Sequence, residues 1–352
     1  MAYISFQPKD NFRTNTYTGN GTELAVTNVG FQSDSTLIKE TDDGNAWNWF
    51  DSVRGATKYL KTSGNNAEAT DAETLKSWQS TGYTVGNSVA SNSSGGAYVG
   101  YNWVAGSSSV PSGGTITPSA VSINTTTKFG IYKYTGTGVG ATIAHGLGLT
   151  PECVIIKNLS GAANWAVYSP YIVASNGGVA NTTWMVLNTN VAQQSNDSGR
   201  WNNTSPTDTT FSVGVSYDQN NKSGDEYIAY VFAAVKGFSA IGSYIANSNA
   251  DGSFVYTGFT PSFVMIKAAD GAANWNIFDN KRAVGNPASY PLWINENAAE
   301  QTDPYPIDIL SQGFKARATS SQVNSTGTDP YLYYAFAESP FVSSNSKPCV
   351  AR

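Results

Sequence analysis

The chain has 352 residues, of which 40% are hydrophobic and only 13% charged, and its formal net charge is −5. This acidic balance and the lack of a Lys/Arg run argue against nucleic acid as a partner, because phosphate binding needs a clustered basic surface. No stretch approaches the roughly 18 apolar residues of a membrane span, so membrane insertion is not expected. The N-terminal residues lack the features of a secretion signal, and we expect synthesis and folding in a cytoplasm.

Residues 1–16 precede the first repeated segment and are predicted to form an extended docking arm. Tyr3, Phe6 and Phe12 stand among polar residues there. Such isolated aromatic side chains on an extended segment are expected to contact another surface.

Two short patterns each occur three times in the chain. In the first, a lysine stands eight positions before a tryptophan, and the copies are about 110 to 118 residues apart. In the second, an asparagine followed three residues later by a glycine precedes an aromatic run. The copies are Lys39/Trp47, Lys157/Trp165 and Lys267/Trp275, then Asn92, Asn221 and Asn324. Two patterns in register three times indicate a tandem array of one folding unit.

These patterns set the predicted bounds of the units. Residues 17–106, 131–237 and 238–341 are interpreted as three repeats of roughly 100 residues each. A Ser/Gly/Thr-rich linker is predicted over 107–130, and a C-terminal tail over 342–352. The short connection between the last two repeats predicts that these two pack closely, with the first more loosely tied.

Each unit is predicted to be all-β. Short apolar runs such as 154–157 and 264–267 are bounded by Gly and Pro, which is typical of strands, and the one helix candidate is 71–78. We therefore predict an all-β fold of three tandem β-sandwich repeats, of jelly-roll or concanavalin-like type. An alternative is a single superstructure in which the three units close around a pseudo-threefold axis.

The repeated tryptophans have two interpretations. They could be saccharide-binding spots, with the ring stacked on a sugar and the lysine bonding its hydroxyls. They could also fill the sandwich core, with the lysine stem over a ring. We favour the core, because identity across units that otherwise differ indicates a shared requirement of the fold. Sugar contacts are expected instead at unshared loop aromatics. These are Trp78, Trp184, Trp201, Tyr290, Trp293 and Tyr305.

Residues for catalysis or metal binding are sparse. His145 is the only histidine, and the matching positions of the other repeats lack it, so we interpret it as part of a turn. Acid pairs could support glycoside hydrolysis, but no pair recurs in all three repeats. The segment 42–44 resembles the start of a calcium loop without its remaining ligands, which leaves structural calcium as an alternative. We predict no catalysis, no cofactor and no metal. The acid pairs are Asp42/Asp43, Asp225/Glu226 and Asp303/Asp308.

The segment 50–60, Phe-Asp-Ser-Val-Arg-Gly-Ala-Thr-Lys-Tyr-Leu, resembles a signature of repeat-bearing virion proteins of marine bacteriophages, including cyanophages. Segments 145–148, 255–259 and 335–341 fit the same family, and the resemblance covers nearly the whole chain. Such proteins are usually labelled tail fibre or uncharacterised phage protein. The resemblance therefore implies a part of the virion surface, made in the host cytoplasm.

From this resemblance we expect a tail fibre or related appendage that binds host cell-surface polysaccharide without catalysis. Its partners would be other virion proteins and further copies of itself in a homotrimer. A single neutral-sugar site binds at about millimolar Kd, and avidity would strengthen it. An alternative is a capsid decoration or connector protein that packs on other virion proteins. A polysaccharide depolymerase is the less favoured alternative.

Overall fold

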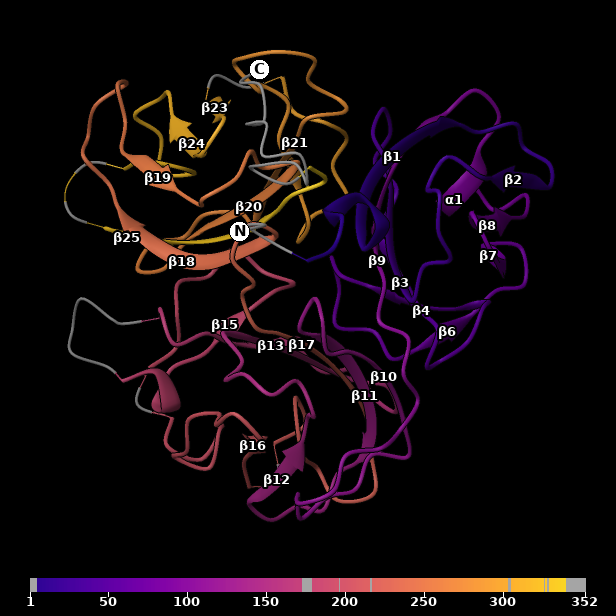
Figure 1. Cartoon of the computed structure of the whole chain (residues 1–352), viewed down its shortest axis with the longest axis vertical. Coiled ribbons are helices and arrows are strands. Elements are labelled where there is room, and N and C mark those ends of the chain that lie inside the picture. Colours follow the sequence, from indigo (N-terminus) through magenta and orange to yellow (C-terminus); the bar gives the residue numbers. More distant parts are fainter. Residues whose placement is uncertain are drawn as a thin grey trace.

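A computed structural model describes residues 5–172, 179–195, 197–215, 217–302, 305–325, 327 and 329–339. As predicted, these residues are nearly all β. The helices among them are short: α1 (Val89–Asn92), η1 (Pro8–Asp10) and η2 (Ala180–Thr182). Figure 1 shows the strands gathered in three lobes around a common centre.

The first lobe pairs a six-stranded sheet, in the order β1-β9-β3-β4-β5-β6, with a three-stranded sheet, β2-β8-β7. Its buried apolar side chains come from both sheets, so the lobe is a sandwich. Its strands are β1 (Phe12–Thr18), β2 (Leu24–Val26), β3 (Ser35–Glu40), β4 (Asn48–Asp51), β5 (Lys58–Lys61), β6 (Ala69–Thr70), β7 (Leu75–Gln79), β8 (Gly82–Val85) and β9 (Ala97–Trp103).

The second lobe contains a sheet in the order β10-β11-β17-β13-β14-β15 and the pair β12-β16. Its strands are β10 (Ala120–Asn124), β11 (Phe129–Thr135), β12 (Ala141–Ala144), β13 (Cys153–Asn158), β14 (Ala166–Tyr168), β15 (Met185–Val186), β16 (Thr210–Val213) and β17 (Glu226–Phe232). The third lobe contains β18-β25-β20-β21-β22 and β19-β24-β23. Its strands are β18 (Ser239–Ile245), β19 (Phe254–Tyr256), β20 (Phe263–Ala268), β21 (Asn276–Asp279), β22 (Leu292–Trp293), β23 (Ile307–Leu310), β24 (Gly313–Ala316) and β25 (Pro330–Phe336).

The middle of each large sheet has the same strand order. Strands β1-β9-β3-β4 correspond to β11-β17-β13-β14 and to β18-β25-β20-β21. In each lobe a tyrosine of the first of these strands stacks on a tyrosine of the second. The stacked pairs are Tyr17/Tyr98, Tyr134/Tyr227 and Tyr244/Tyr331, with ring centroids 5.1, 5.3 and 5.2 Å apart. The two sequence patterns thus fall at equivalent places in three sheets, while the repeat bounds that we assigned stay a prediction.

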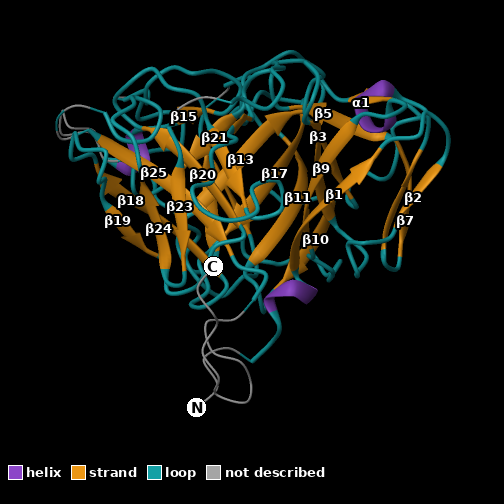
Figure 2. Cartoon of the chain, turned by 90° about the horizontal axis from the view of Figure 1, so that it is seen from above, coloured by secondary structure: helices purple, strands orange, loops and turns teal. Residues whose placement is uncertain are grey.

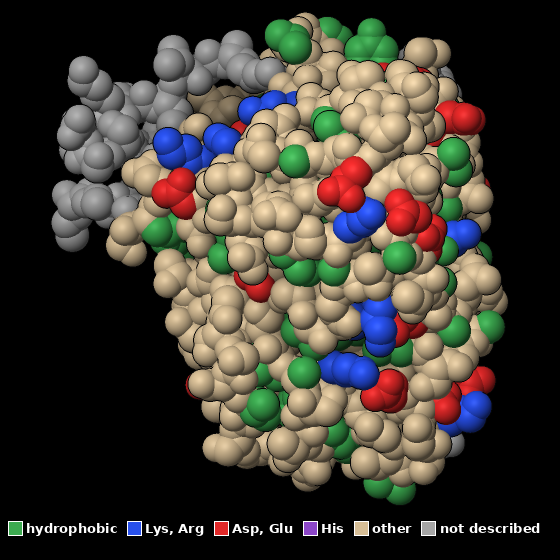
Figure 3. Space-filling view, turned by 90° about the vertical axis from the view of Figure 1, so that its right-hand side faces the viewer, with side chains coloured by type: hydrophobic (Ala, Val, Ile, Leu, Met, Phe, Trp, Pro, Cys, Tyr) green, Lys and Arg blue, Asp and Glu red, His purple; other side chains and the backbone are tan. Residues whose placement is uncertain are grey.

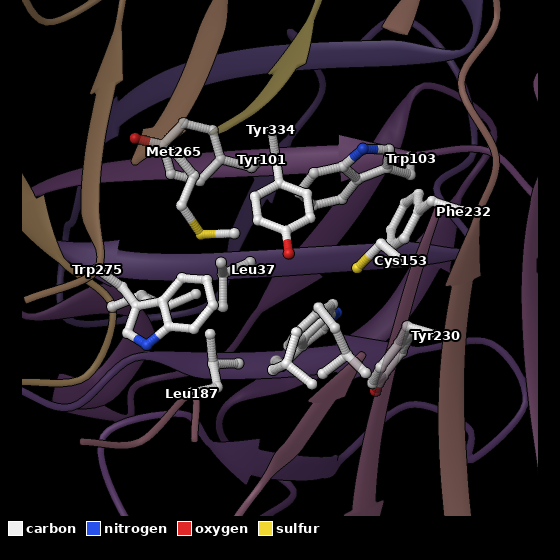
Figure 4. Close-up of a cluster of buried hydrophobic side chains, with 14 of the residues drawn as sticks. Leu37, Tyr101, Trp103, Cys153, Leu187, Tyr230, Phe232, Met265, Trp275 and Tyr334 are labelled. Atoms are coloured by element: carbon white, nitrogen blue, oxygen red, sulfur yellow. The ribbon is translucent and has the colours of Figure 1, made fainter. Parts of the chain in front are cut away.

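Side-chain alternation along the central strands divides the apolar residues between two kinds of core. Ile38 faces the interior of the first lobe, whereas its neighbour Leu37 faces a hub shared by all three lobes. Figure 4 shows side chains of the three lobes meeting there, among them Leu37, Cys153 and Met265. The expectation that the first lobe is loosely tied is wrong, because Phe12 packs on Phe336 of the third lobe at 5.2 Å.

The repeated tryptophans close this hub as a ring of hydrogen bonds. All three are fully buried, which confirms the core interpretation, but they fill the space between lobes and not the inside of a sandwich. Each indole donates to a backbone carbonyl of a different lobe: first to third, second to first, third to second. The bonds are Trp47 Nε1 to Trp293 O (2.8 Å), Trp165 Nε1 to Lys61 O (3.2 Å) and Trp275 Nε1 to Val186 O (3.0 Å).

The repeated lysines are also fully buried, and their ammonium groups bond backbone carbonyls. Lys157 Nζ donates to Asn65 O of the first lobe (3.2 Å), and Lys267 Nζ donates to Asn190 O of the second (3.4 Å). Burial lowers the pKa of Lys39 and Lys157 to about 8 and that of Lys267 to about 7. Lys157 and Lys267 therefore fasten one lobe to the next, a role that we did not expect from the sequence, whereas Lys39 bonds the carbonyls of Glu40 and Asp43 in its own lobe.

Two of the three lobe interfaces contain a buried Tyr–Asp–Arg group. Tyr101 Oη donates to Asp279 Oδ2 (2.7 Å), and Asp279 pairs with Arg282 at 2.6 Å. Burial opposes ionisation of Asp279, but Arg282 outweighs it and holds the pKa below its usual value. Tyr230, Asp51 and Arg54 repeat this arrangement between the second and first lobes. At the third interface, Ser169 directly follows β14, as Asp279 ends β21, and the Tyr334 hydroxyl faces Ser169 and Cys153 and has no carboxylate partner among the described residues.

Three predictions about segments need correction. The predicted arm ends earlier, because Phe12 begins β1 and is buried in the hub; Phe6 packs on Phe238 of the same chain at 5.3 Å, and Tyr3 lies outside the described residues. The predicted linker 107–130 contains β10 and the start of β11, which join the second large sheet. The predicted helix 71–78 runs into β7 instead. The predicted tail 342–352 lies outside the described residues.

The body has two distinct ends, because the strands of all lobes run along a common direction. Figure 2 shows η1 at one end, which we name the proximal end, and α1 at the other, the distal end. Glu338 accepts a hydrogen bond from Thr14 N (2.8 Å), so the chain enters and leaves near the proximal end. Strand β20 starts opposite Phe336 and ends opposite Tyr331, which places the loop before Trp275 at the distal end.

Candidate functional site

The third lobe has a pocket of about 520 Å³ at its distal end. It lies between the loop before Trp275, the end of β22 and the turns before β25. Its lining is Asn274, Trp293, Tyr305, Ala318, Thr319, Ser320, Ser321 and Gln322. This lining has two aromatic rings and no ionisable acid or base apart from the tyrosine.

The aromatic wall is fixed from two sides. Trp293 ends β22 and pairs with Asn276 of β21, and its carbonyl accepts the hub hydrogen bond from Trp47. Its indole Nε1 donates to the Tyr305 hydroxyl at 2.9 Å. Tyr305 is only 4% exposed. The hub therefore holds the Trp293 backbone while Tyr305 sets the orientation of the ring.

The polar wall is held by side-chain amides. Gln322 Oε1 accepts hydrogen bonds from Asn274 N (2.9 Å) and Asn276 Nδ2 (3.2 Å), and Asn295 Nδ2 donates to Asn274 Oδ1 (2.8 Å). Within the described residues, Gln322 Nε2 and the Thr319 hydroxyl make no hydrogen bond. These two groups remain available to a ligand in the pocket.

This combination suits an uncharged polyhydroxylated ligand. An aromatic ring offers a flat apolar surface to the C–H face of a sugar, while amides and hydroxyls bond its hydroxyl groups. Ligand pockets commonly combine an aromatic surface with a few oriented polar groups. The described lining residues include no lysine or arginine that could pair with an acidic ligand.

The aromatic pair is specific to the third lobe. The three hub acceptors are Trp293, Lys61 and Val186, so these residues occupy equivalent positions in the three lobes. This strand position is common to the three lobes, but only the third lobe has a tryptophan there. That unshared aromatics contact sugars stays a prediction.

The other four predicted site residues lie elsewhere. In the second lobe, Trp184 is buried beneath the Arg200 guanidinium, which lies 3.9 Å from its ring centroid, and Trp201 Nε1 donates to Thr183 O (3.0 Å). Both therefore act as packing residues. Trp78 is half-buried on β7 in the first lobe, and Tyr290 is 41% exposed in a loop of the third. The pocket brings together only Trp293 and Tyr305 of the six. The polar wall of the pocket was not predicted.

His145 has the structural role expected of it. It is fully buried, its Nδ1 accepts from Leu147 N (3.1 Å), and its Nε2 lies 3.1 Å from Thr207 O. Burial lowers its pKa, which favours the neutral ring.

The described members of the predicted acid pairs do not line the pocket. Asp42 accepts from Ala97 N in a distal loop, Asp225 accepts from Asn158, and Asp303 lies outside the described residues. In the part of the chain that the structure describes, no three His, Cys, Asp or Glu residues could hold a metal ion. Likewise, none of its helices is long and apolar enough to cross a membrane.

Residues 7–340 match a protein family described as a domain of unknown function, DUF7483. The chain belongs to the DUF7483 family. The matched region runs through all three lobes as one domain, in agreement with their common hub. A search of curated proteins finds no match. The face of the protein that Figure 3 shows is mostly uncharged, with acidic and basic side chains interspersed.

Proposed function

We propose that this DUF7483 protein is a non-catalytic virion structural protein of a bacteriophage, a tail fibre or related appendage that binds host cell-surface polysaccharide. The observation that carries the binding role is the distal pocket, where Trp293 and Tyr305 face an uncharged wall of amides and hydroxyls. The virion assignment rests on the resemblance of segment 50–60 to phage virion proteins.

The position of the pocket supports display toward a cell surface. The first and last described parts of the chain meet at the proximal end, where Thr14 bonds Glu338. A body attached through that end would direct its distal end outward. The pocket would then be presented to the host.

A single pocket of this kind would bind weakly, with a Kd of about 1 mM. Among the described residues, the Trp293/Tyr305 pair occurs once, because Lys61 and Val186 stand in place of Trp293 in the other two lobes. We therefore propose assembly into homotrimers, which would multiply the sites on one appendage and raise the avidity.

A depolymerase is not part of this proposal. Glycoside hydrolysis uses two carboxyl groups about 5 to 10 Å apart across the scissile bond. The described residues that line the pocket include no carboxylate.

The binding role is tested by titrating the full-length protein with neutral oligosaccharides released from host surface polysaccharide, using isothermal calorimetry. Trp293→Ala should weaken binding at least tenfold, whereas Trp78→Ala, which removes a half-buried tryptophan of the first lobe, should leave it unchanged. Circular dichroism checks that both variants fold. Equal affinity of Trp293→Ala and the wild type would refute the site.

The virion role is tested separately by electron microscopy of intact particles with a gold label on the C-terminus. Label on the tail supports an appendage. Label on the head supports the alternative of a capsid decoration or connector protein, and particles without label contradict a virion role altogether.

A further inference from the structure

Strand β19 forms an open edge of the third lobe. It pairs on one side with β24 in the three-stranded sheet β19-β24-β23. Thr257 N donates to Gln312 O (2.9 Å), and hydrogen-bonded pairs alternate along an antiparallel ladder. The N–H and C=O groups of Phe254 and Tyr256 therefore point away from β24. Within the described residues they have no hydrogen-bond partner.

The two residues at this edge also expose large side chains. Phe254 is 51% exposed and Tyr256 60%, while Val255 between them is buried in the lobe. Gly313 stands opposite Tyr256, so no side chain covers that ring from the neighbouring strand. Exposed edges are usually shortened, charged or covered, because they attract further strands. Two aromatic residues on an open edge instead favour contact with a partner.

The second lobe shows how the equivalent edge is filled. Strand β12 occupies the place of β19, with Thr142 in the position of Phe254. There the chain's own segment 114–116 runs parallel to the edge: Ile116 N donates to Thr142 O (2.9 Å), and Thr142 N donates to Thr115 Oγ1 (2.8 Å). Ile116 is 6% exposed and packs in the core of the lobe. In the second lobe this edge therefore accepts an extended parallel segment, through an isolated bridge and one aliphatic anchor.

We propose that β19 binds an extended segment of a separate protein of different sequence by parallel strand addition. The segment would carry an aliphatic residue beside Val255, as Ile116 lies beside Ile143, and small or hydroxyl residues around it. Phe254 and Tyr256 would cover the added strand from the outer face. Main-chain hydrogen bonds supply affinity in this mode of recognition, and side-chain pockets supply selectivity.

The first lobe provides an internal control. Its edge strand β2 has Ala25 at the position of Phe254, and Thr27 follows at the position of Tyr256. That edge thus lacks aromatic side chains to hold a segment, and we expect binding at β19 alone.

The test uses a fluorescent synthetic peptide with the sequence of residues 111–119, Pro-Ser-Gly-Gly-Thr-Ile-Thr-Pro-Ser, and the full-length protein. Anisotropy should show saturable binding, weakened at least tenfold by Phe254→Pro, which removes an outward N–H and leaves the bonds to β24. Ala25→Pro should not change binding.

If Phe254→Pro fails to fold, the double variant Phe254→Ala/Tyr256→Ala should show the same loss. No binding at millimolar peptide, or equal binding by the β19 variants, overturns the proposal. Self-association of the chain that Phe254→Pro abolishes would overturn it as well, because the occupant would then be a second copy.

Discussion

The indole Nε1 of Trp47 donates a hydrogen bond to the backbone carbonyl of Trp293, which lies on a different lobe, at a distance of 2.8 Å. This contact links the hub to the distal pocket. Trp47 belongs to the repeated framework of the hub, and Trp293 forms the aromatic wall of the distal pocket. The framework and the candidate site therefore meet at a single residue.

Trp47→Phe should destabilise the whole body in one step. The substitution keeps an aromatic ring but leaves the Trp293 carbonyl without its donor, which costs about 1–3 kcal/mol for a buried acceptor. Because the hub joins all three lobes, urea unfolding followed by tryptophan fluorescence and circular dichroism should give one coincident transition. Separate transitions for individual lobes would contradict the shared hub.

Equivalent tyrosines should respond differently to loss of their hydroxyl. Tyr101→Phe removes a bond to the buried carboxylate of Asp279 and should cost about 1.5–3 kcal/mol. Tyr334→Phe removes a hydroxyl that faces Cys153 and Ser169 and has no carboxylate partner, so it should cost clearly less than Tyr101→Phe. Chemical denaturation of the two variants provides the comparison, and similar losses for both would disprove the difference between the interfaces.

Stability should rise with pH above neutrality. The pKa of Lys267 falls to about 7 in the folded protein, below its unfolded value, because of burial. Between these values the unfolded state binds more protons, so stability increases with pH, by up to about 1.4 kcal/mol per pH unit for one lysine. Below the folded pKa this dependence vanishes. Denaturation from about pH 7 to about pH 9 measures the slope, which avoids the titration of tyrosines near pH 10.

Lys267→Met is the matching variant for this pH series. Because methionine does not titrate, this variant should lose the contribution of one lysine to the slope of stability against pH. An unchanged slope would show that Lys267 stays protonated in the folded protein, held by the carbonyls of Ala268 and Gly271.

Loss of a buried asparagine amide should lower stability in any lobe, but it should weaken saccharide binding only in the third. Asn324 Nδ2 bonds Ala318 O, at the pocket wall, as well as Asn249 O. Asn324→Ala should cost about 2–4 kcal/mol and also weaken saccharide binding. Asn92→Ala removes the equivalent bond to Gly86 O in the first lobe and should destabilise without affecting the pocket. Loss of binding in both variants would indicate general unfolding.

Much of the secondary structure and the burial of the repeated tryptophans could be predicted from local patterns. The apolar runs bounded by Gly and Pro form β13 and β20. In the second pattern, Gly95 and Gly224 have positive φ, which glycine adopts readily. The asparagine of that pattern donates hydrogen bonds from its side-chain amide to backbone carbonyls that are distant in the sequence. Turn propensity depends on neighbouring residues and can be predicted from them. Long-range hydrogen bonds depend on the fold and cannot.

The errors have the same origin. Phe12 resembled part of an arm because polar residues surround it, yet β1 lies in a sheet whose one face meets the hub. The sequence identified Trp293 and Tyr305 as unshared aromatics. It could not show that they meet at one pocket, because 11 residues and a change of sheet separate them. Ser, Thr and Gln are common in loops, so their presence in the sequence did not predict the polar wall of the pocket.

Ring closure within one polypeptide has a further consequence for how this body behaves. Threefold assemblies of separate subunits dissociate on dilution, because their stability depends on protomer concentration. Here Trp47, Trp165 and Trp275 join lobes that the backbone already connects, so the central body cannot exchange parts or fall apart at low concentration. Covalent linkage also frees each lobe to diverge, as shown by Trp293, Lys61 and Val186, which stand at equivalent positions.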